Sequence, residues 1–123
     1  MYGNSSVGHQ LMAFDTAVIN GGSCYNTSTG RFTAQVAGYY HFSASGMAVV
    51  VGNSGDTQLA IRLNGSIYAN SNPGGSNPGS TNMYVAAQTW LNVGDYVDTS
   101  FASSSSIYFY GDAGKWNQFS GYL

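Results

Sequence analysis

Short runs of aromatic and β-branched residues, separated by Gly, Asn and Ser, follow one another along the whole chain. Almost nowhere does an apolar pattern with helical spacing extend over ten residues without meeting Gly or Asn, so helix is disfavoured throughout. The runs have the composition of β-strands, and turn-forming residues between them are typical of an antiparallel sandwich or barrel. We therefore expect an all-β protein with strands at residues 14–19, 31–35, 39–51, 58–63, 66–69, 84–91, 96–102, 107–110 and 116–123.

The clearest turn signal is Asn64-Gly65, which lies between the runs at residues 58–63 and 66–69. Both residues readily take the positive φ values that a type I′ turn requires at its two central positions. The pair therefore predicts a β-hairpin that joins these two strands.

A second turn-rich segment spans residues 70–82 and contains both prolines of the chain within a repeated Ser-Asn-Pro-Gly pattern. Proline cannot donate a main-chain hydrogen bond to a sheet, and Gly and Asn favour turns, so we expect a surface loop here. Asn72 and Asn77 of this loop are candidates for contact with a ligand or partner.

The chain is short and carries few charges. Its 123 residues correspond to one domain, and only 7% of them are charged, with no Glu and a net charge of −2. Such a chain lacks the basic stripe that neutralises nucleic-acid phosphates, and no apolar run approaches the roughly 20 residues that cross a bilayer. The single Cys24 cannot form an internal disulfide. We expect one domain, residues 1–123, that binds no nucleic acid and inserts into no membrane.

Side-chain alternation along the expected strands separates an apolar face from a second face that is aromatic and small-polar. The first face carries Tyr40, Phe42, Ala44, Gly46, Val85, Ala87, Thr89, Leu91, Phe119, Gly121 and Leu123, and the second carries Tyr39, His41, Ser43, Ser45, Tyr84, Ala86, Gln88, Trp90, Ser120 and Tyr122.

The second face has no charged residue, although a solvated sheet face would normally hold Lys and Glu. Large aromatic area without charge is typical of the core of a protein interface. We therefore expect these strands to bury the first face in the core and the second face against another chain.

Spaced motifs over nearly the whole chain resemble, in the right order, those of the globular head domain of complement C1q and its relatives. The matching segments are Phe14-Asp15, Tyr25-Asn-Thr-Ser-Thr-Gly30-Arg31-Phe32-Thr33, Val36-Ala37-Gly38-Tyr39-Tyr40-His41-Phe42, Asn64-Gly65, Leu91-Asn-Val-Gly94-Asp95-Tyr-Val97 and Phe119-Ser120-Gly121-Tyr122-Leu123.

The resemblance implies a ten-stranded antiparallel jelly-roll sandwich of the C1q and tumour-necrosis-factor type that assembles as a compact homotrimer. Transferred strand by strand, it makes the second face the trimer contact, with Tyr39, His41, Gln88 and Tyr122 as the interface residues. At a threefold axis His41 would meet its own copies and change charge near pH 6. Only residues 1–4 remain to supply the first strand of the family, so we expect that strand to be truncated or the chain to belong to a longer product.

No arrangement of residues predicts catalysis or metal binding. No Gly-x-Ser-x-Gly motif leads from a strand into a helix, and neither His9 nor His41 has a second ligand at metal-binding spacing. A glycosidase needs two neighbouring carboxylates, and the five Asp are scattered across turns. We expect a non-enzymatic protein with no catalytic residue, no metal and no cofactor.

Some aromatic side chains have the flat apolar surface that stacks on sugar rings. They serve either as contacts to a ligand or as core and oligomer contacts, and the sequence leaves both readings open. The candidates are Trp90, Tyr108, Tyr110 and Trp116.

A trimeric head without a collagen-like or coiled-coil stem fits three settings. We expect the first, the surface of a virus particle, because the chain is poor in charge and rich in Gly, Ser, Asn and Tyr. There it would be a capsid decoration (cement) protein or the receptor-binding tip of a tail fibre, in contact with capsid or tail proteins or with a host-surface glycan or protein. The alternatives are a secreted C1q-like lectin or adhesin and, third, a cytokine-like ligand.

Overall fold

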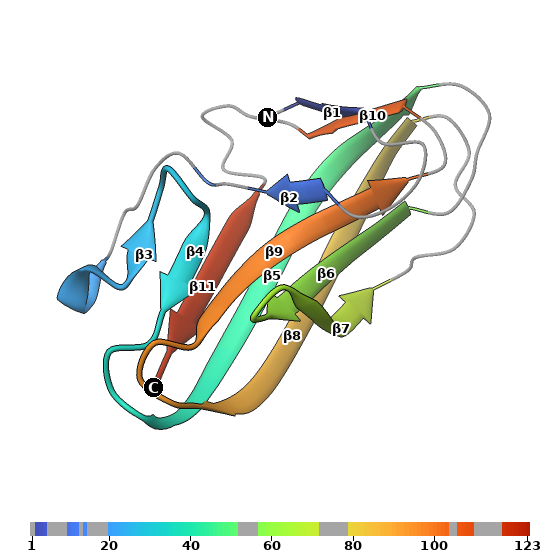
Figure 1. Ribbon diagram of the computed structural model, residues 1–123. Coiled ribbons are helices and arrows are strands. Elements are labelled where there is room, and N and C mark those ends of the chain that lie inside the picture. Colours follow the sequence, from blue (N-terminus) through green and yellow to red (C-terminus); the bar gives the residue numbers. More distant parts are fainter. Residues whose placement is uncertain are drawn as a thin grey trace.

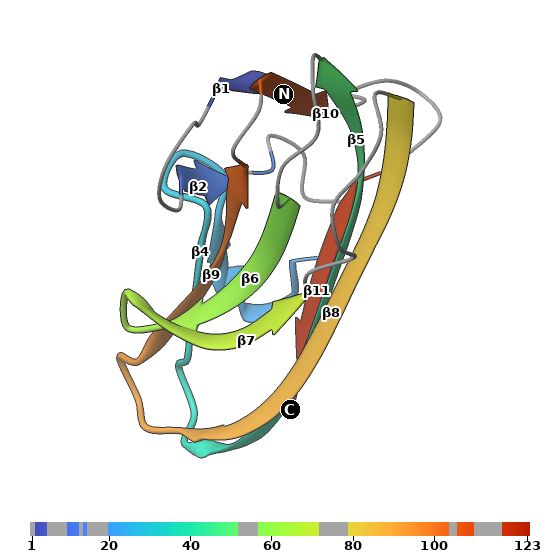
Figure 2. The same cartoon turned by 90° about the vertical axis from the view of Figure 1, so that its right-hand side faces the viewer.

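The computed structural model of the protein describes residues 2–4, 10–12, 14, 20–51, 57–71, 79–103, 106–109 and 117–123. Two antiparallel β-sheets pack face to face over these residues (Figures 1 and 2). We call them sheet A and sheet B. In Figure 2 both sheets are seen edge-on, with the long strands of sheet A on the right. The expectation of an all-β antiparallel sandwich is confirmed.

Sheet A is organised around its longest strand, β5 (Gly38–Val51). One edge of β5 pairs along almost its whole length with β8 (Gly79–Leu91), from Gly38 opposite Leu91 to Val50 opposite Gly79. The other edge is shared by two shorter strands, β11 (Gln118–Tyr122) and β10 (Ser106–Phe109), and β10 pairs in turn with β1 (Tyr2–Asn4).

Sheet B is organised around β9 (Tyr96–Ser103), which pairs along one edge with β6 (Thr57–Leu63). Strand β7 (Ser66–Ser71) pairs with the other edge of β6. The other edge of β9 pairs with β4 (Arg31–Thr33) and β2 (Gln10–Met12), and β3 (Tyr25–Asn26) pairs in turn with β4. A short 3-10 turn, η1 (Gly21–Ser23), precedes β3.

The core lies between the two sheets and is filled by the face that the alternation predicted. Phe42 and Leu91 from sheet A are fully buried against Leu59, Ile61 and Val97 from sheet B. Aromatic rings link the layers: the Phe32 and Phe42 ring centroids are 5.2 Å apart in an edge-to-face arrangement, which aromatic pairs prefer.

Leu123 is an exception to the predicted alternation. It was assigned to the core face, but it lies beyond the end of β11 and is 67% exposed. Its Cδ1 occupies the place that a Cβ on residue 38 would take, which is available because that residue is Gly38. Leu123 therefore lies beside Gly38 of β5, but most of its side chain is left uncovered.

The Asn64-Gly65 hairpin between β6 and β7 is confirmed. Both residues have positive φ, 49° at Asn64 and 87° at Gly65, as a type I′ turn requires. The Asn64 side chain also joins this turn to sheet B, because its Oδ1 accepts a hydrogen bond of 2.9 Å from the backbone N–H of Tyr96.

The loop expected at residues 70–82 is shorter than predicted. Strand β7 continues to Ser71, and β8 already begins at Gly79, where residues 79–82 pair with residues 47–50 of β5. A sheet ladder uses main-chain groups, so Ser, Thr and Asn join it when a long partner strand such as β5 is available. Residues 72–78 lie outside the described residues.

Two short strands, β2 and β3, were not predicted, whereas β1 lies within residues 1–4, where the truncated first strand was expected. Strands β1, β2 and β3 have only two or three residues each, too few to show an alternation. Phe14 has no regular structure, and the rest of the predicted strand 14–19 lies outside the described residues.

Gly121 in β11 leaves room for the central core ring. A Cβ at this position would lie within 2.5 Å of Phe42, whose ring is fully buried and stacked 5.9 Å from that of Phe119. We expect Gly121→Ala to lower the free energy of unfolding by about 1–3 kcal/mol, the usual cost of overpacking a core. Urea denaturation will measure the change.

Gly21→Ala is the matched control, because nothing lies within 4 Å of a Cβ at that position. It should alter the free energy of unfolding by less than about 0.5 kcal/mol. Equal stability of the two variants would contradict the role assigned to Gly121.

Candidate functional site

The face of sheet A that points away from the core is the candidate interaction surface, and we call it the outer face. Alternation along three adjacent strands places the same kinds of side chain there, aromatic, amide, hydroxyl and methyl. It consists of Tyr39, His41, Ser43 and Ser45 from β5, Tyr84, Ala86, Gln88 and Trp90 from β8, and Gln118, Ser120 and Tyr122 from β11.

The sheet register brings three of the four predicted interface residues into one row. His41 on the middle strand lies opposite Gln88 on one side and opposite Tyr122 on the other. Directly opposite residues on one face have Cβ atoms about 5 Å apart, so these three side chains are neighbours. The fourth residue, Tyr39, lies two positions from His41 on the same face of β5.

Large aromatic side chains are exposed at both ends of the outer face. Tyr39 is 75% exposed and Tyr122 61%, and Tyr84 toward the other end is 62% exposed. Tyr39 and Trp90 lie opposite each other, with ring centroids 5.1 Å apart in a T-shaped arrangement. The indole Nε1 of Trp90 donates a hydrogen bond of 3.1 Å to Asn92, which holds the exposed ring in place.

A row of small side chains lies between the aromatic ones. Ser43 is opposite Ser120 and Ala86, and the hydroxyl oxygens of the two serines are 2.7 Å apart in a hydrogen bond. The larger side chains of Tyr122 and Tyr84 flank this row. The outer face therefore alternates between large and small side chains, which can interdigitate with another protein surface.

His41 has a polar atom without a partner. Its ring stacks on that of Tyr122, with 5.1 Å between the centroids and 27° between the planes. In the described part of the chain, its Nδ1 is the one buried side-chain nitrogen or oxygen that makes no hydrogen bond. Buried polar atoms are usually paired, so this nitrogen marks a position where a contact is incomplete.

The charged side chains lie elsewhere. Those that the structure describes are Arg31, Arg62, Asp95 and Asp98, and all belong to sheet B or to the turn between β8 and β9. On the described strands, the outer face therefore has no charge, as the sequence predicted.

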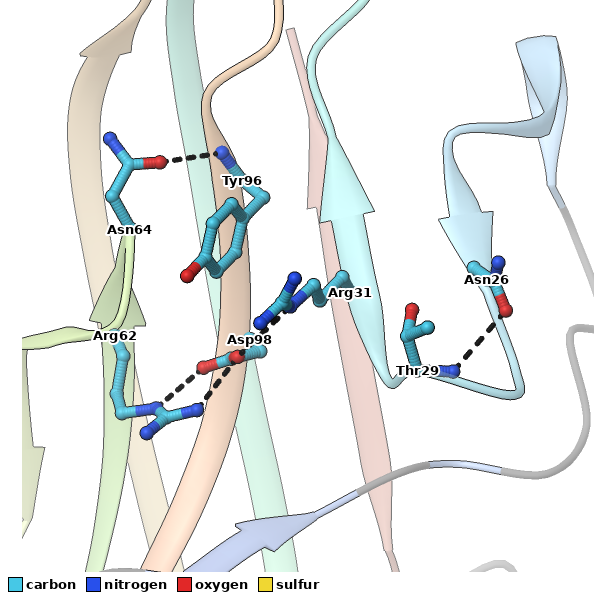
Figure 3. Close-up of polar contacts among 7 residues, drawn as sticks. All are labelled: Asn26, Thr29, Arg31, Arg62, Asn64, Tyr96 and Asp98. Carbon is cyan, nitrogen blue, oxygen red and sulfur yellow. Dashed lines mark hydrogen bonds and ion pairs between the residues drawn. The ribbon is translucent and has the colours of Figure 1, made fainter.

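An ion-paired cluster that the sequence did not predict lies on the face of sheet B that points away from sheet A (Figure 3). The Asp98 side chain is fully buried, and its two oxygens accept hydrogen bonds from Nε and Nη2 of Arg62 at 2.6 and 2.8 Å. Hydrogen bonding to Asp98 raises the pKa of Arg62 above its ordinary value. Arg31 lies 4.0 Å from the same carboxylate, with its guanidinium 4.1 Å from the centre of the Tyr96 ring.

No local motif could have revealed this pair, because Arg62 and Asp98 are 36 residues apart. They meet because β6 and β9 pair with these two residues opposite each other. Arg62 and Asp98 neutralise each other and hold β6 to β9, whereas the half-exposed Arg31 adds a second cation beside the same carboxylate.

The predicted ligand contacts are not assembled into one site. Trp90 lies opposite Tyr39, whereas the backbone of Tyr108 pairs with Val49, ten residues further along β5. Ten strand residues span about 33 Å, so Trp90 and Tyr108 lie near opposite ends of sheet A. The other four candidates, Tyr110, Trp116, Asn72 and Asn77, lie outside the described residues.

The described residues do not form a metal centre. No group of three or more His, Cys, Asp or Glu side chains among them could hold a metal ion. In the same residues, no helix has the length and apolar character needed to span a bilayer.

Comparison with known proteins identifies the family. The sequence model of the C1q domain matches residues 3–123. The chain belongs to the C1q domain family. Members of this family are generally non-enzymatic proteins that form trimers and bind proteins or glycans. No curated protein matches the chain in sequence.

The fold agrees with this assignment. The chain is similar to the globular domain of zebrafish complement 1qA protein, with a TM-score of 0.74, 18% sequence identity, and coverage of 100% of this chain and 90% of that one. The C1q domain described here is thus an antiparallel jelly-roll sandwich, as the sequence motifs predicted.

Proposed function

We propose that this C1q domain is a non-enzymatic homotrimer whose copies meet through the outer face of sheet A. The observation that carries the proposal is the Tyr122–His41–Gln88 row at the middle of a charge-free, aromatic face. Exposed aromatic side chains gathered on one face of a soluble domain are typical of a protein interaction surface. Membership of a family that forms trimers makes a second and third copy of the chain the occupants.

The composition of the face fits a contact around a threefold axis. Side chains close to such an axis meet their own copies, so charged side chains there would repel one another or be buried without a partner. Tyr, Gln and Ser avoid both problems, because their hydroxyl and amide groups donate and accept hydrogen bonds in either direction. Tyr39 and Tyr122 are the anchor residues of the proposed contact, with Gln88 and His41 as its polar centre.

Sedimentation equilibrium or light scattering on the purified protein tests this proposal. We expect a mass about three times the 12.9 kDa of one chain at micromolar concentration and neutral pH. A species of 12.9 kDa at that concentration would overturn it.

We further propose that the trimer is a structural or receptor-binding protein at the surface of a virus particle, either a capsid decoration protein or a tail-fibre tip. The chain is 7% charged and rich in Gly, Ser, Asn and Tyr, which supports a surface built from hydroxyl and amide groups. Electron microscopy of particles labelled with an antibody to the protein tests this. Labelling over the capsid supports decoration, labelling at the fibre ends supports a tip, and unlabelled particles contradict both.

A secreted lectin or adhesin is the second candidate, and the exposed ring of Trp90 favours it. This ring is 49% exposed, and aromatic faces of this kind stack on the apolar side of sugar rings. A glycan array compared between the wild type and Trp90→Ala tests this candidate. Binding that the variant loses would support it, and an array without any bound glycan would contradict it.

A further inference from the structure

We infer that His41 makes assembly of this protein dependent on pH, because protonation of the imidazole places charge in a contact that has nothing to neutralise it. The inference rests on the proposed trimer and names a form of regulation for it. It is argued from the position of His41, from the groups around it and from the proton linkage that follows.

The position of His41 is central in the outer face. It lies on β5, the middle strand, with Gln88 opposite on one side and Tyr122 on the other. The Tyr122 ring covers part of the imidazole, and Nδ1 is already buried without a hydrogen-bond partner in the described part of the chain. A second copy laid on this face would remove much of the remaining water from the ring.

The described groups around the imidazole offer no counter-charge. No carboxylate forms an ion pair with His41 in the described chain, including the one at the end of Leu123. The neighbouring side chains on the described strands are tyrosine, serine, glutamine and alanine, and none of them is a carboxylate. The groups that face His41 are Tyr39 and Ser43 on β5, Tyr122 and Ser120 on β11, and Gln88 and Ala86 on β8.

The direction of the effect follows from linkage. A charged group buried without a counter-ion costs free energy, and only the assembled form would bury a charged imidazole in this way. Acidification therefore favours the separate copies. Each of the three copies contributes one imidazole, so we expect association to weaken by about tenfold or more between pH 7.5 and pH 5.5.

Sedimentation velocity over a dilution series at pH 7.5 and pH 5.5 tests the inference on the whole chain. We expect the wild type to dissociate at a much higher concentration at pH 5.5, with an unchanged circular dichroism spectrum. His41→Gln keeps a neutral polar side chain and should remove most of this difference. His9→Gln changes the other histidine of the chain and should leave the difference as in the wild type.

The possible outcomes distinguish failure of the pH dependence from failure of the proposed trimer. A wild-type monomer at pH 7.5 would overturn the trimer itself. A trimer equally stable at both pH values, or a pH dependence lost in His9→Gln and kept in His41→Gln, would overturn only the role of His41. If His41→Gln does not fold, His41→Asn takes its place, and the assembly of that variant should be equally insensitive to pH.

Discussion

Asp98→Ala will destabilise the fold more than any other single replacement of a charged residue in the described chain. The carboxylate is fully buried and holds Arg62 through two hydrogen bonds of 2.6 and 2.8 Å. Its removal leaves the guanidinium of Arg62, which is partly buried, without its partner, and breaking such a pair from one side costs about 3–5 kcal/mol. Because an arginine guanidinium stays charged at every ordinary pH even without such a partner, loss of a proton will not relieve the unpaired charge in the variant.

Chemical denaturation at pH 7 measures the change in the free energy of unfolding, and two further variants test its cause. Asp95→Ala removes a carboxylate that receives hydrogen bonds from Asn92 and Asn64 in an exposed turn, so it should cost no more than about 1–2 kcal/mol. The double variant Asp98→Leu with Arg62→Met should recover much of the loss, because neither charge is then left without its partner. A double variant less stable than Asp98→Ala would contradict this account.

Tyr122→Asp should convert the trimer into monomers. Tyr122 is 61% exposed in the single chain, so the substitution leaves the core intact and the monomer folded. In the proposed assembly it buries one carboxylate per copy on an outer face whose described strands hold no Lys or Arg, at a cost of several kcal/mol for each. Light scattering should give the mass of one chain, and circular dichroism should show an unchanged β-sheet spectrum.

Ile67→Asp is the matched control for this variant. Ile67 is an apolar residue of similar exposure, 50%, but it lies on β7 of sheet B. It should leave the trimer intact. Dissociation by Ile67→Asp, or a fully trimeric Tyr122→Asp, would place the contact on a face other than the one proposed.

Local sequence determined the strands and the two faces of sheet A. A period of two along residues 38–46 is enough to separate Phe42, which is fully buried, from Tyr39, which is exposed. The Asn64-Gly65 turn was predictable for the same reason, because positive φ at two consecutive residues is a property of those residues themselves. The spaced motifs likewise identified the C1q family, which the match over residues 3–123 confirms.

Only the tertiary structure decided which residues of different strands meet. Whether His41 faces Gln88 and Tyr122, or Asp98 faces Arg62, depends on the register between strands that are 36 or more residues apart in the sequence. The same register drew residues 79–82 into β8, although their composition indicated a loop. A single strand determines which side chains share a face, but the main-chain hydrogen bonds between strands determine their neighbours, and these bonds form only when the whole sheet assembles.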